Sequence, residues 1–222
     1  MKKIVCLSDT HNCNQEITVP DGDILIHSGD AAINGTQFEI EAFLKWFSAL
    51  PHKHKIFVAG NHDWLYETDN RLARILTENY GITYLQDSFV EIEGLKIYGS
   101  PWQPRFFDWA FNLDRGEQMA EKWKSIPHDI DILITHGPPH GILDEVPRKY
   151  WTENTGCEEL MKRIEEISAF GRLKLHVFGH IHCGYGQTEK FGVKFVNAAT
   201  CNEEYKPVQP PITVEIAADT VI

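Results

Sequence analysis

The sequence has no long apolar run near its start. The two lysines of "MKKIVCLSDTHN" are followed by only four apolar residues before Ser8. A secretory signal needs an apolar region of about 7–15 residues, and a membrane-spanning helix needs about 20. We therefore expect neither a leader nor a membrane anchor, and we expect the protein to be cytoplasmic.

Cysteine pairs at close spacing are also absent. The 5 cysteines form no C-x-x-C motif, and an odd number does not suit a disulfide framework. This usage is typical of a cytosolic protein with reduced thiols. The thiols belong to Cys6, Cys13, Cys157, Cys183 and Cys201.

Basic residues are few and scattered. Lys and Arg number 21 against 32 Asp and Glu, which gives a net charge of −11. Such a surface repels phosphate backbones and anionic lipids, so we expect no nucleic-acid polymer and no membrane as a partner. A DNA exonuclease is disfavoured for the same reason. The total charge does not exclude a locally positive site, because divalent metals held by buried aspartates reverse the local field.

Repeats, low-complexity tracts and linkers are absent as well. With 222 residues and 42% hydrophobic content, the chain is long enough to bury a core. We predict one domain over residues 1–222. The oligomeric state cannot be inferred from these features.

Short apolar runs alternate with segments of helical period. The runs are rich in Ile, Leu and Val, which is typical of strands buried on both faces, and polar loops containing glycine follow them. This alternation predicts an α/β fold with a mostly parallel sheet. The predicted strands are 3–7, 23–29, 55–60, 131–137 and 174–180, and the predicted helices are 36–50, 70–80, 116–126 and 157–170.

Two further stretches are predicted to be antiparallel hairpins. Residues 89–100 would turn near Glu93-Gly94, and residues 186–198 would turn near Phe191-Gly192. Together with the segment 211–216 they indicate a second sheet. The expected fold therefore has two mixed β-sheets flanked by helices.

Every predicted parallel strand is followed by a residue that can bind metal. Functional groups of α/β sheets gather at the carboxyl ends of strands, and residues two apart on extended backbone point to one side. Imidazole, carboxylate and amide ligands suit Mn, Fe, Zn, Co or Ni better than Ca or Mg. Seven such ligands suit two ions about 3.5–4 Å apart that share one carboxylate. The strand-end residues are Asp9, His11, Asp30, Asn61, His62, Asp63, His136, His180 and His182.

Each of these motifs is weak alone. A single "GD" or "DTH" is common in turns, and "GHIH" also fits a pair of satisfied buried histidines. The ordered set at five strand ends favours a metal site over that alternative. Cys13 and Cys183 lie close to His11 and His182 in sequence, so a zinc site with thiolate ligands is a further, less favoured alternative.

The ordered motifs D-x-H, GD, GNHD, HGPP and GHxH resemble those of the calcineurin-like metallophosphoesterases. The resemblance covers essentially the whole chain. The stretches "LPHKHKIFVAGNHD", "IYGSPWQPRFFDWAFN", "LHVFGHIHCGYG" and "NAATC" are most similar to the metallophosphoesterase-domain (MPPED-type) phosphodiesterases. The resemblance implies a four-layer αββα sandwich with a two-metal site at the carboxyl ends of the strands.

The resemblance also implies a role for each strand-end residue. His62 would be the general acid or a phosphate contact, and Asp63 its partner. Many protein phosphatases of this family carry Asp-Arg where this chain has Ile33 and Asn34, which argues against a phosphoprotein phosphatase. One metal would be held by Asp9, His11 and His182, the other by Asn61, His136 and His180, and Asp30 would bridge the two.

The expected reaction is hydrolysis of a small-molecule phosphodiester, with cyclic nucleotides among the candidate substrates. A hydroxide held between two divalent ions, Mn²⁺ first among Mn, Fe, Zn, Ni and Co, would attack phosphorus in line. His62 would donate a proton to the leaving oxygen. A phosphomonoesterase acting on a small molecule and a non-catalytic, metal-bound interaction scaffold are the alternatives.

The aromatic-rich segment 101–112 is a candidate wall of the substrate pocket. We predict that Trp102, Arg105, Asn112 and His140 contact substrate, with Trp102 stacking on a flat group and Arg105 binding an anion. The alternative is that the aromatic residues of this segment form a small satellite core.

Overall fold

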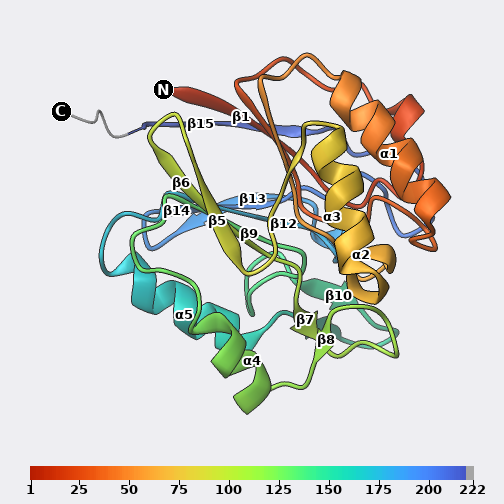
Figure 1. Cartoon of the computed structure of the whole chain (residues 1–222). Helices are drawn as coiled ribbons and strands as arrows, with labels where there is room; N and C mark the ends of the chain where they lie inside the picture. The colour runs from red at the N-terminus through yellow and green to blue at the C-terminus, as the bar shows by residue number, and fades with distance from the viewer. Residues whose placement is uncertain (219–222) are drawn as a thin grey trace.

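The computed structural model describes residues 1–218, which form two facing β-sheets with helices outside them (Figure 1). The first sheet has the strand order β15-β1-β2-β3-β4. Strands β1 to β4 are parallel, and β15 pairs antiparallel with β1. The strands are β1 (Lys2–Leu7), β2 (Ile24–His27), β3 (His54–Phe57), β4 (Thr83–Tyr84) and β15 (Ile212–Ile216).

The second sheet has the order β13-β14-β12-β9-β6-β5. Its four inner strands are parallel, and its two edge strands are the outer halves of antiparallel hairpins. The predicted hairpins and the two mixed sheets are thus confirmed. The strands are β5 (Ser88–Ile92), β6 (Leu95–Ser100), β9 (Ile132–Thr135), β12 (Leu175–Phe178), β13 (Gly186–Lys190) and β14 (Val193–Asn197).

One strand was predicted in the wrong sheet. The segment 211–216 contains β15, which pairs with β1 in the first sheet and not with the hairpins. Its alternating pattern identifies an edge strand, but the pairing partner depends on where the preceding loop returns the chain.

Helices cover the outer face of each sheet, which gives the four layers implied by the sequence. Figure 1 shows α1 and α3 on one side of the molecule and α4 and α5 on the opposite side. Helix α1 begins with a capping box between Thr36 and Glu39 and ends before Pro51. The helices are α1 (Gln37–Ala49), α2 (Leu65–Thr68), α3 (Asn70–Asn79), α4 (Glu117–Trp123) and α5 (Glu158–Ser168).

Side-chain alternation along the strands divides the core into layers. Ile4 and Cys6 of β1 belong to the cluster between the two sheets, whereas Val5 and Leu7 belong to the cluster under α1. All four side chains are fully buried. This two-sided burial explains why the parallel strands have continuous apolar sequences.

The remaining elements are short and lie in the loops. Two small strand pairs are β7 (Gln103–Pro104) with β8 (Asn112–Leu113) and β10 (Glu145–Pro147) with β11 (Thr152–Asn154). The 3-10 turns are η1 (Asn14–Glu16) and η2 (His182–Gly184). Within residues 1–218 no helix is both long enough and apolar enough to cross a membrane.

Candidate metal centre

The loops after five parallel strands bring the candidate ligands together. Asp9 follows β1, Asp30 follows β2, Asn61 follows β3, His136 follows β9 and His180 follows β12. The first three strands belong to one sheet and the last two to the other. The site therefore spans the carboxyl ends of both sheets.

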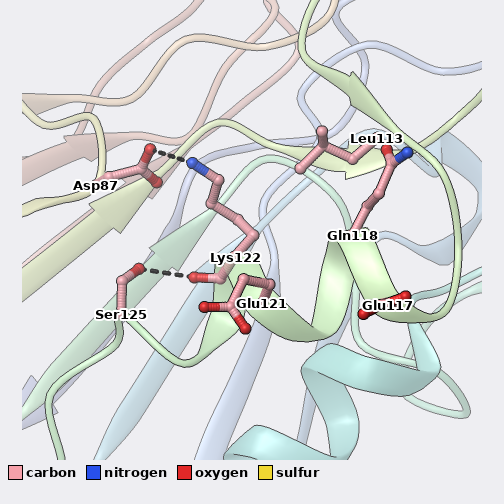
Figure 2. A pocket seen from close by; sticks show the side chains of 7 residues that line it. All are labelled: Asp87, Leu113, Glu117, Gln118, Glu121, Lys122 and Ser125. Carbon is pink, nitrogen blue, oxygen red and sulfur yellow. Dashed lines mark hydrogen bonds and ion pairs between the residues drawn. The ribbon is translucent and has the colours of Figure 1, made fainter.

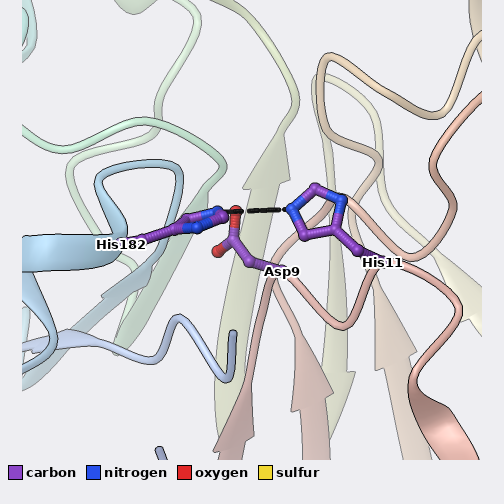
Figure 3. A group of neighbouring side chains, drawn as sticks. All are labelled: Asp9, His11 and His182. Carbon is purple, nitrogen blue, oxygen red and sulfur yellow. Dashed lines mark hydrogen bonds and ion pairs between the residues drawn. The ribbon is translucent and has the colours of Figure 1, made fainter. Parts of the chain in front are cut away.

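The first group of ligands consists of Asp9, His11 and His182. Figure 3 shows the two imidazoles approaching from opposite sides, with the carboxylate of Asp9 between them. Asp9 Oδ1 lies 3.3 Å from Nε2 of His182 and 3.9 Å from Nε2 of His11. The two Nε2 atoms are themselves 3.3 Å apart.

The second group consists of Asp30, His136 and His180, with Asn61 beside it. Asp30 Oδ2 lies 3.3 Å from Nε2 of His136, which is 2.9 Å from Oδ1 of Asn61. Asp30 also faces the first group, because its Oδ2 is 3.9 Å from Nε2 of His11. One carboxylate oxygen thus lies between the two groups.

The orientation of the imidazole rings fits metal binding. Nδ1 of His11, His136 and His182 each contacts a backbone carbonyl, those of Ala32, Ser28 and Asn202, at 2.9–3.1 Å. A carbonyl only accepts, so these Nδ1 atoms donate to it and the Nε2 atoms point into the site, where each can bind a cation once it is deprotonated. Histidine ligands of metals are held in this way.

The charges of the site also fit metal binding. Burial alone would raise the pKa of Asp9, but its hydrogen bond to His182 holds that pKa well below the usual range. Burial lowers the pKa of His182, but the contact with Asp9 outweighs it and raises the pKa to about 9. The pKa of His136 also rises to about 9 against burial, because of Asp30. Without metal, these carboxylates hold protons on their imidazole neighbours, and divalent ions would displace those protons.

The backbone is strained where the ligands meet. Asp9, His11, Asp30 and His180 have φ between 41° and 66°, a region that residues other than glycine rarely occupy. Close packing leaves no room for a side chain at Gly179, where a Cβ would lie 2.0 Å from Oδ2 of Asp9. Strain of this kind clusters at functional sites.

His62 and Asp63 are not partners, contrary to the expectation from the sequence. His62 Nδ1 contacts the carbonyl of Ile33 at 2.6 Å, and its ring packs 4.2 Å from that of Trp109. The fully buried Asp63 accepts hydrogen bonds from the backbone N–H groups of residues 30, 31, 32 and 60. Its carboxylate therefore fixes the loop that carries Asp30, and does not contact the imidazole of His62.

His62 remains placed for chemistry. Its Nε2 lies 4.0 Å from Oδ2 of Asp30, and its side chain lines a hollow of about 250 Å³ over the ligands. The other lining residues include His180, His182, Phe106 and Tyr205.

The predicted substrate contacts divide into two groups. Arg105 lines a second hollow next to the ligands. Trp102 instead donates a hydrogen bond to Asp87, and the side chain of Asn112 bonds the backbone of Phe106 and Phe107. These two residues stabilise the segment 101–112 and do not line either hollow near the ligands.

His140 and the two thiols also lie outside the ligand groups. His140 is 3.8 Å from Asp144 and lines neither hollow. Cys13 faces the backbone carbonyls of His11 and Tyr205, and Cys183 faces that of Glu145. Neither thiol belongs to a ligand group found among residues 1–218.

Two aromatic residues of the site have contacts that the sequence does not show. The Tyr205 ring lies 4.7 Å from that of His11, and the Phe106 ring lies 5.8 Å from that of His180. Tyr205 comes from the loop before β15, which has no metal-binding motif. Phe106 lies in the aromatic segment 101–112. The sequence pattern there does not show which aromatic residues line the substrate pocket and which pack into a core.

A larger hollow lies outside the ligand groups. It measures about 660 Å³ and is lined partly by helix α4 (Figure 2). Three of its lining residues are acidic (Asp87, Glu117 and Glu121), and its Lys122 already pairs with Asp87 at 2.8 Å. It contains none of the predicted site residues, so size does not identify the functional site.

Known proteins are similar to this chain in sequence and in fold. The family model described as calcineurin-like phosphoesterase matches residues 2–184. Human metallophosphoesterase domain-containing protein 1 is 41% identical over 235 residues, which cover 96% of this chain and 71% of that protein. UPF0046 protein K07C11.7 of Caenorhabditis elegans is 37% identical, covering 99% of this chain and 77% of its own.

Solved structures show the same fold at low identity. One superposes with a TM-score of 0.66 and 17% identity over 88% of this chain and 90% of its own. The crystal structure of TT1561 of Thermus thermophilus gives a TM-score of 0.59 at 14% identity, over 88% of each chain. Together with the sequence matches, this shows that the chain belongs to the calcineurin-like phosphoesterase family, which is a family of phosphoester hydrolases that typically bind divalent metals.

Proposed function

We propose that the protein is a phosphodiesterase that uses two divalent ions, with Mn²⁺ as the first candidate. The observation that carries the proposal is the position of Asp30, whose Oδ2 lies 3.3 Å from His136 Nε2 and 3.9 Å from His11 Nε2. A carboxylate between two sets of imidazoles suits a bridging ligand. One ion would be held by Asp9, His11 and His182, and the other by Asn61, His136 and His180.

When bound, such ions polarise phosphoryl oxygens and lower the pKa of bound water. The side chains of the chain supply the remaining functions. His62 has Nδ1 fixed by the Ile33 carbonyl, so its Nε2 can hold a proton toward the leaving oxygen. Trp109 packs on this ring and Tyr205 lines the same hollow, and both restrict the access of bulk water.

The preference for diesters rests on the open second hollow beside His180. It offers space of about 400 Å³ for a second ester arm, which a monoester of small size would leave empty. We expect a small-molecule substrate and neither a nucleic-acid polymer nor a membrane as partner, because the net charge is −11.

A panel of substrates tests the proposal. The purified protein, with its metal content measured, is assayed on mono-, di- and cyclic phosphoesters with Mn²⁺, Ni²⁺, Zn²⁺ and Mg²⁺. We expect two ions per chain and faster hydrolysis of diesters than of monoesters. A higher rate on monoesters would assign a phosphatase, and two bound ions without any hydrolysis would assign a non-catalytic scaffold.

A further inference from the structure

A pocket next to the metal centre has a distinct lining. It measures about 400 Å³, within the range of small-molecule sites. The hollow over the metal ligands has Phe106, Val146, His180 and Ile181 in common with it, so the two adjoin. A substrate whose phosphoryl group lies at the metals can therefore place one arm in this pocket.

Arginine dominates the charged lining of this pocket. Arg105, Arg115 and Arg148 line it, together with a single acid, Glu153. This is the reverse of the whole chain, where acids exceed bases by 11. We call this space the arginine pocket.

Each guanidinium is held in place by neighbouring groups. Arg105 Nε donates to Asp114 at 2.6 Å, Arg148 Nε donates to Glu153 at 2.7 Å, and Arg115 Nη2 donates to the carbonyl of Thr155 at 2.6 Å. Asp114 does not line the pocket. Guanidinium groups held in this way are preorganised for an oxyanion.

The second observation is a buried amide without a partner. Gln103 lines the arginine pocket and is 1% exposed, yet neither atom of its carboxamide has a hydrogen-bond partner. Its backbone N–H donates to the carbonyl of Phe111 at 3.0 Å, which fixes the backbone at this position. A buried polar group left unpaired destabilises the fold, so the persistence of this one requires an explanation.

We propose that the arginine pocket binds a second oxyanion, a carboxylate or phosphate, carried on one arm of the phosphoester substrate. The Gln103 Nε2 group donates a hydrogen bond to this oxyanion, and Arg105 and Arg148 supply the charge. This inference rests on the proposed function, because the other end of the substrate lies at the metals. It assigns the substrate class as a phosphodiester with a further negative charge on one arm.

Binding without turnover tests the pocket separately from catalysis. The metal-loaded protein is titrated by calorimetry with propylphosphonate, 4-phosphonobutyrate and propane-1,3-bisphosphonate. The second and third probes carry an added carboxylate or phosphonate. We expect them to bind at least about tenfold more tightly than propylphosphonate, since a hydrogen bond to a charged group contributes about 1.5–3 kcal/mol. Equal affinities of all three probes would overturn the proposal.

Variants then identify the residues responsible. Gln103→Leu and Arg148→Met are expected to lower the affinity ratio of 4-phosphonobutyrate to propylphosphonate by about tenfold each. The matched controls Gln37→Leu and Arg71→Met are exposed, lie outside the pocket and are expected to keep the ratio. Gln103→Leu should not lower the Tm, because it removes an unpaired buried amide. A lower Tm with an unchanged ratio would make Gln103 a structural residue and refute its role.

Hydrolysis provides the second readout. Ethyl p-nitrophenyl phosphate is compared with the p-nitrophenyl phosphodiester of 3-hydroxypropionate, which adds a carboxylate to the arm and keeps the leaving group. We expect kcat/KM to favour the carboxylate substrate by about tenfold or more. Selective binding of the phosphonates without hydrolysis of either diester would refute the proposed function and leave the oxyanion site established. Hydrolysis of both diesters at equal kcat/KM would refute the oxyanion site and leave the function established.

Discussion

Buried and half-buried carboxylates have different partners at the two ends of the sheets. At the amino ends of the strands, Glu93 accepts hydrogen bonds from Lys2, Lys53 and His54. There the fully buried Asp131 accepts from Lys174 Nζ at 3.1 Å. At the carboxyl ends, Asp9 and Asp30 face imidazoles.

The amino ends of the strands therefore contribute to stability, whereas the carboxyl ends are arranged for function. Lysine and arginine carry permanent charge, so the amino ends are neutralised by the chain itself. Imidazoles with a carbonyl at Nδ1 point Nε2 into the site and can exchange its proton for a metal ion, so the carboxyl ends can take up cations from solution. The chain has a strained backbone at the same end, where Asp9 and Asp30 have φ of 51° and 56°. Proteins place such costs at functional sites.

The largest expected effect is the loss of the bridging carboxylate. Asp30→Asn keeps the shape of the side chain and removes its charge, so we expect fewer than two ions per chain. The loss of kcat/KM should be about 10³-fold or more, since loss of one preorganised electrostatic group alone costs about 10²–10³-fold. Elemental analysis and diester hydrolysis measure both effects. Asp129→Asn, at an exposed carboxylate at the amino ends, is the matched control.

The assignment of ligands to the two ions can be tested by pairs of substitutions. We expect His182→Ala and His180→Ala each to leave one ion, because they remove ligands of different ions. The His11/His182 double variant should still bind one ion, and the His180/His182 double variant none. If the His180/His182 variant retains one ion, both residues serve the same metal and the assignment is wrong.

The next largest effect is expected from replacing Asp131, a buried carboxylate at the amino ends of the strands. Asp131 is fully buried, and its carboxylate is within 3.1 Å of both Arg172 Nη2 and Lys174 Nζ. Asp131→Ala removes a buried carboxylate together with its hydrogen bonds from the Lys96 N–H, Arg172 and Lys174, and we expect a loss of about 1.5–3 kcal/mol in the free energy of unfolding. Metal content and turnover of the folded protein should stay as in the wild type. Denaturant unfolding measures the loss.

An exposed neighbour provides the control for this substitution. Asp129 pairs with Lys96 Nζ at 2.7 Å, and its side chain is 63% exposed. Asp129→Ala should cost less than about 1 kcal/mol, as surface ion pairs do. If the folded Asp131→Ala protein lost its metals, the two ends would not be independent and the comparison would fail.

The metal-binding side chains at the strand ends could be predicted from the sequence. The backbone carbonyl groups that orient them could not. Apolar runs predicted the parallel strands, and their following residues include Asp9, Asp30 and His136, which the structure brings together. The carbonyl of Asn202 that orients His182 could belong to any residue type, so no sequence pattern identifies it.

Long-range packing explains the other contacts that the sequence did not predict. Tyr205 reaches His11 only because the loop before β15 folds back over the site. Asp63 was expected to orient His62, because the two are adjacent in the motif. The carboxylate instead accepts the backbone N–H groups of the loop after β2, which is distant in sequence but adjacent in the sheet. Sequence adjacency predicted membership of the site, but not the hydrogen-bond partner.

A smaller effect is expected from the proton donor than from the bridging carboxylate. His62→Ala should lower kcat for an activated diester by about 10²-fold, at the lower end of the range for general acid–base catalysis. The metal content should remain at two ions, because His62, which lies near His11 and Asp30, belongs to neither proposed ligand set. His128→Ala, at a half-exposed histidine, is the control. Unchanged kcat with both ions bound would remove His62 from the reaction.

The smallest effect concerns pH and a buried histidine outside the metal centre. His176 is fully buried in β12, donates to or accepts from Thr135 Oγ1 at 2.8 Å, and has a pKa lowered by burial to about 3. The folded state excludes a proton that the unfolded chain binds below pH 6.5. Stability is therefore fully present above pH 6.5 and falls as the pH drops toward 3, by about 1.4 kcal/mol per pH unit for this residue.

Replacing this imidazole should reduce the acid sensitivity of the fold. His176→Gln retains a hydrogen-bonding group toward Thr135 and removes the titration, so the slope of unfolding free energy against pH between 6 and 4 should decrease by about 1.4 kcal/mol per unit. Chelated protein is used, so that loss of metals from the carboxyl ends does not contribute. His128→Gln, whose side chain is 49% exposed, should keep the wild-type slope. Equal slopes for both variants would mean that the acid sensitivity arises from other buried groups, such as the imidazoles of the metal centre itself.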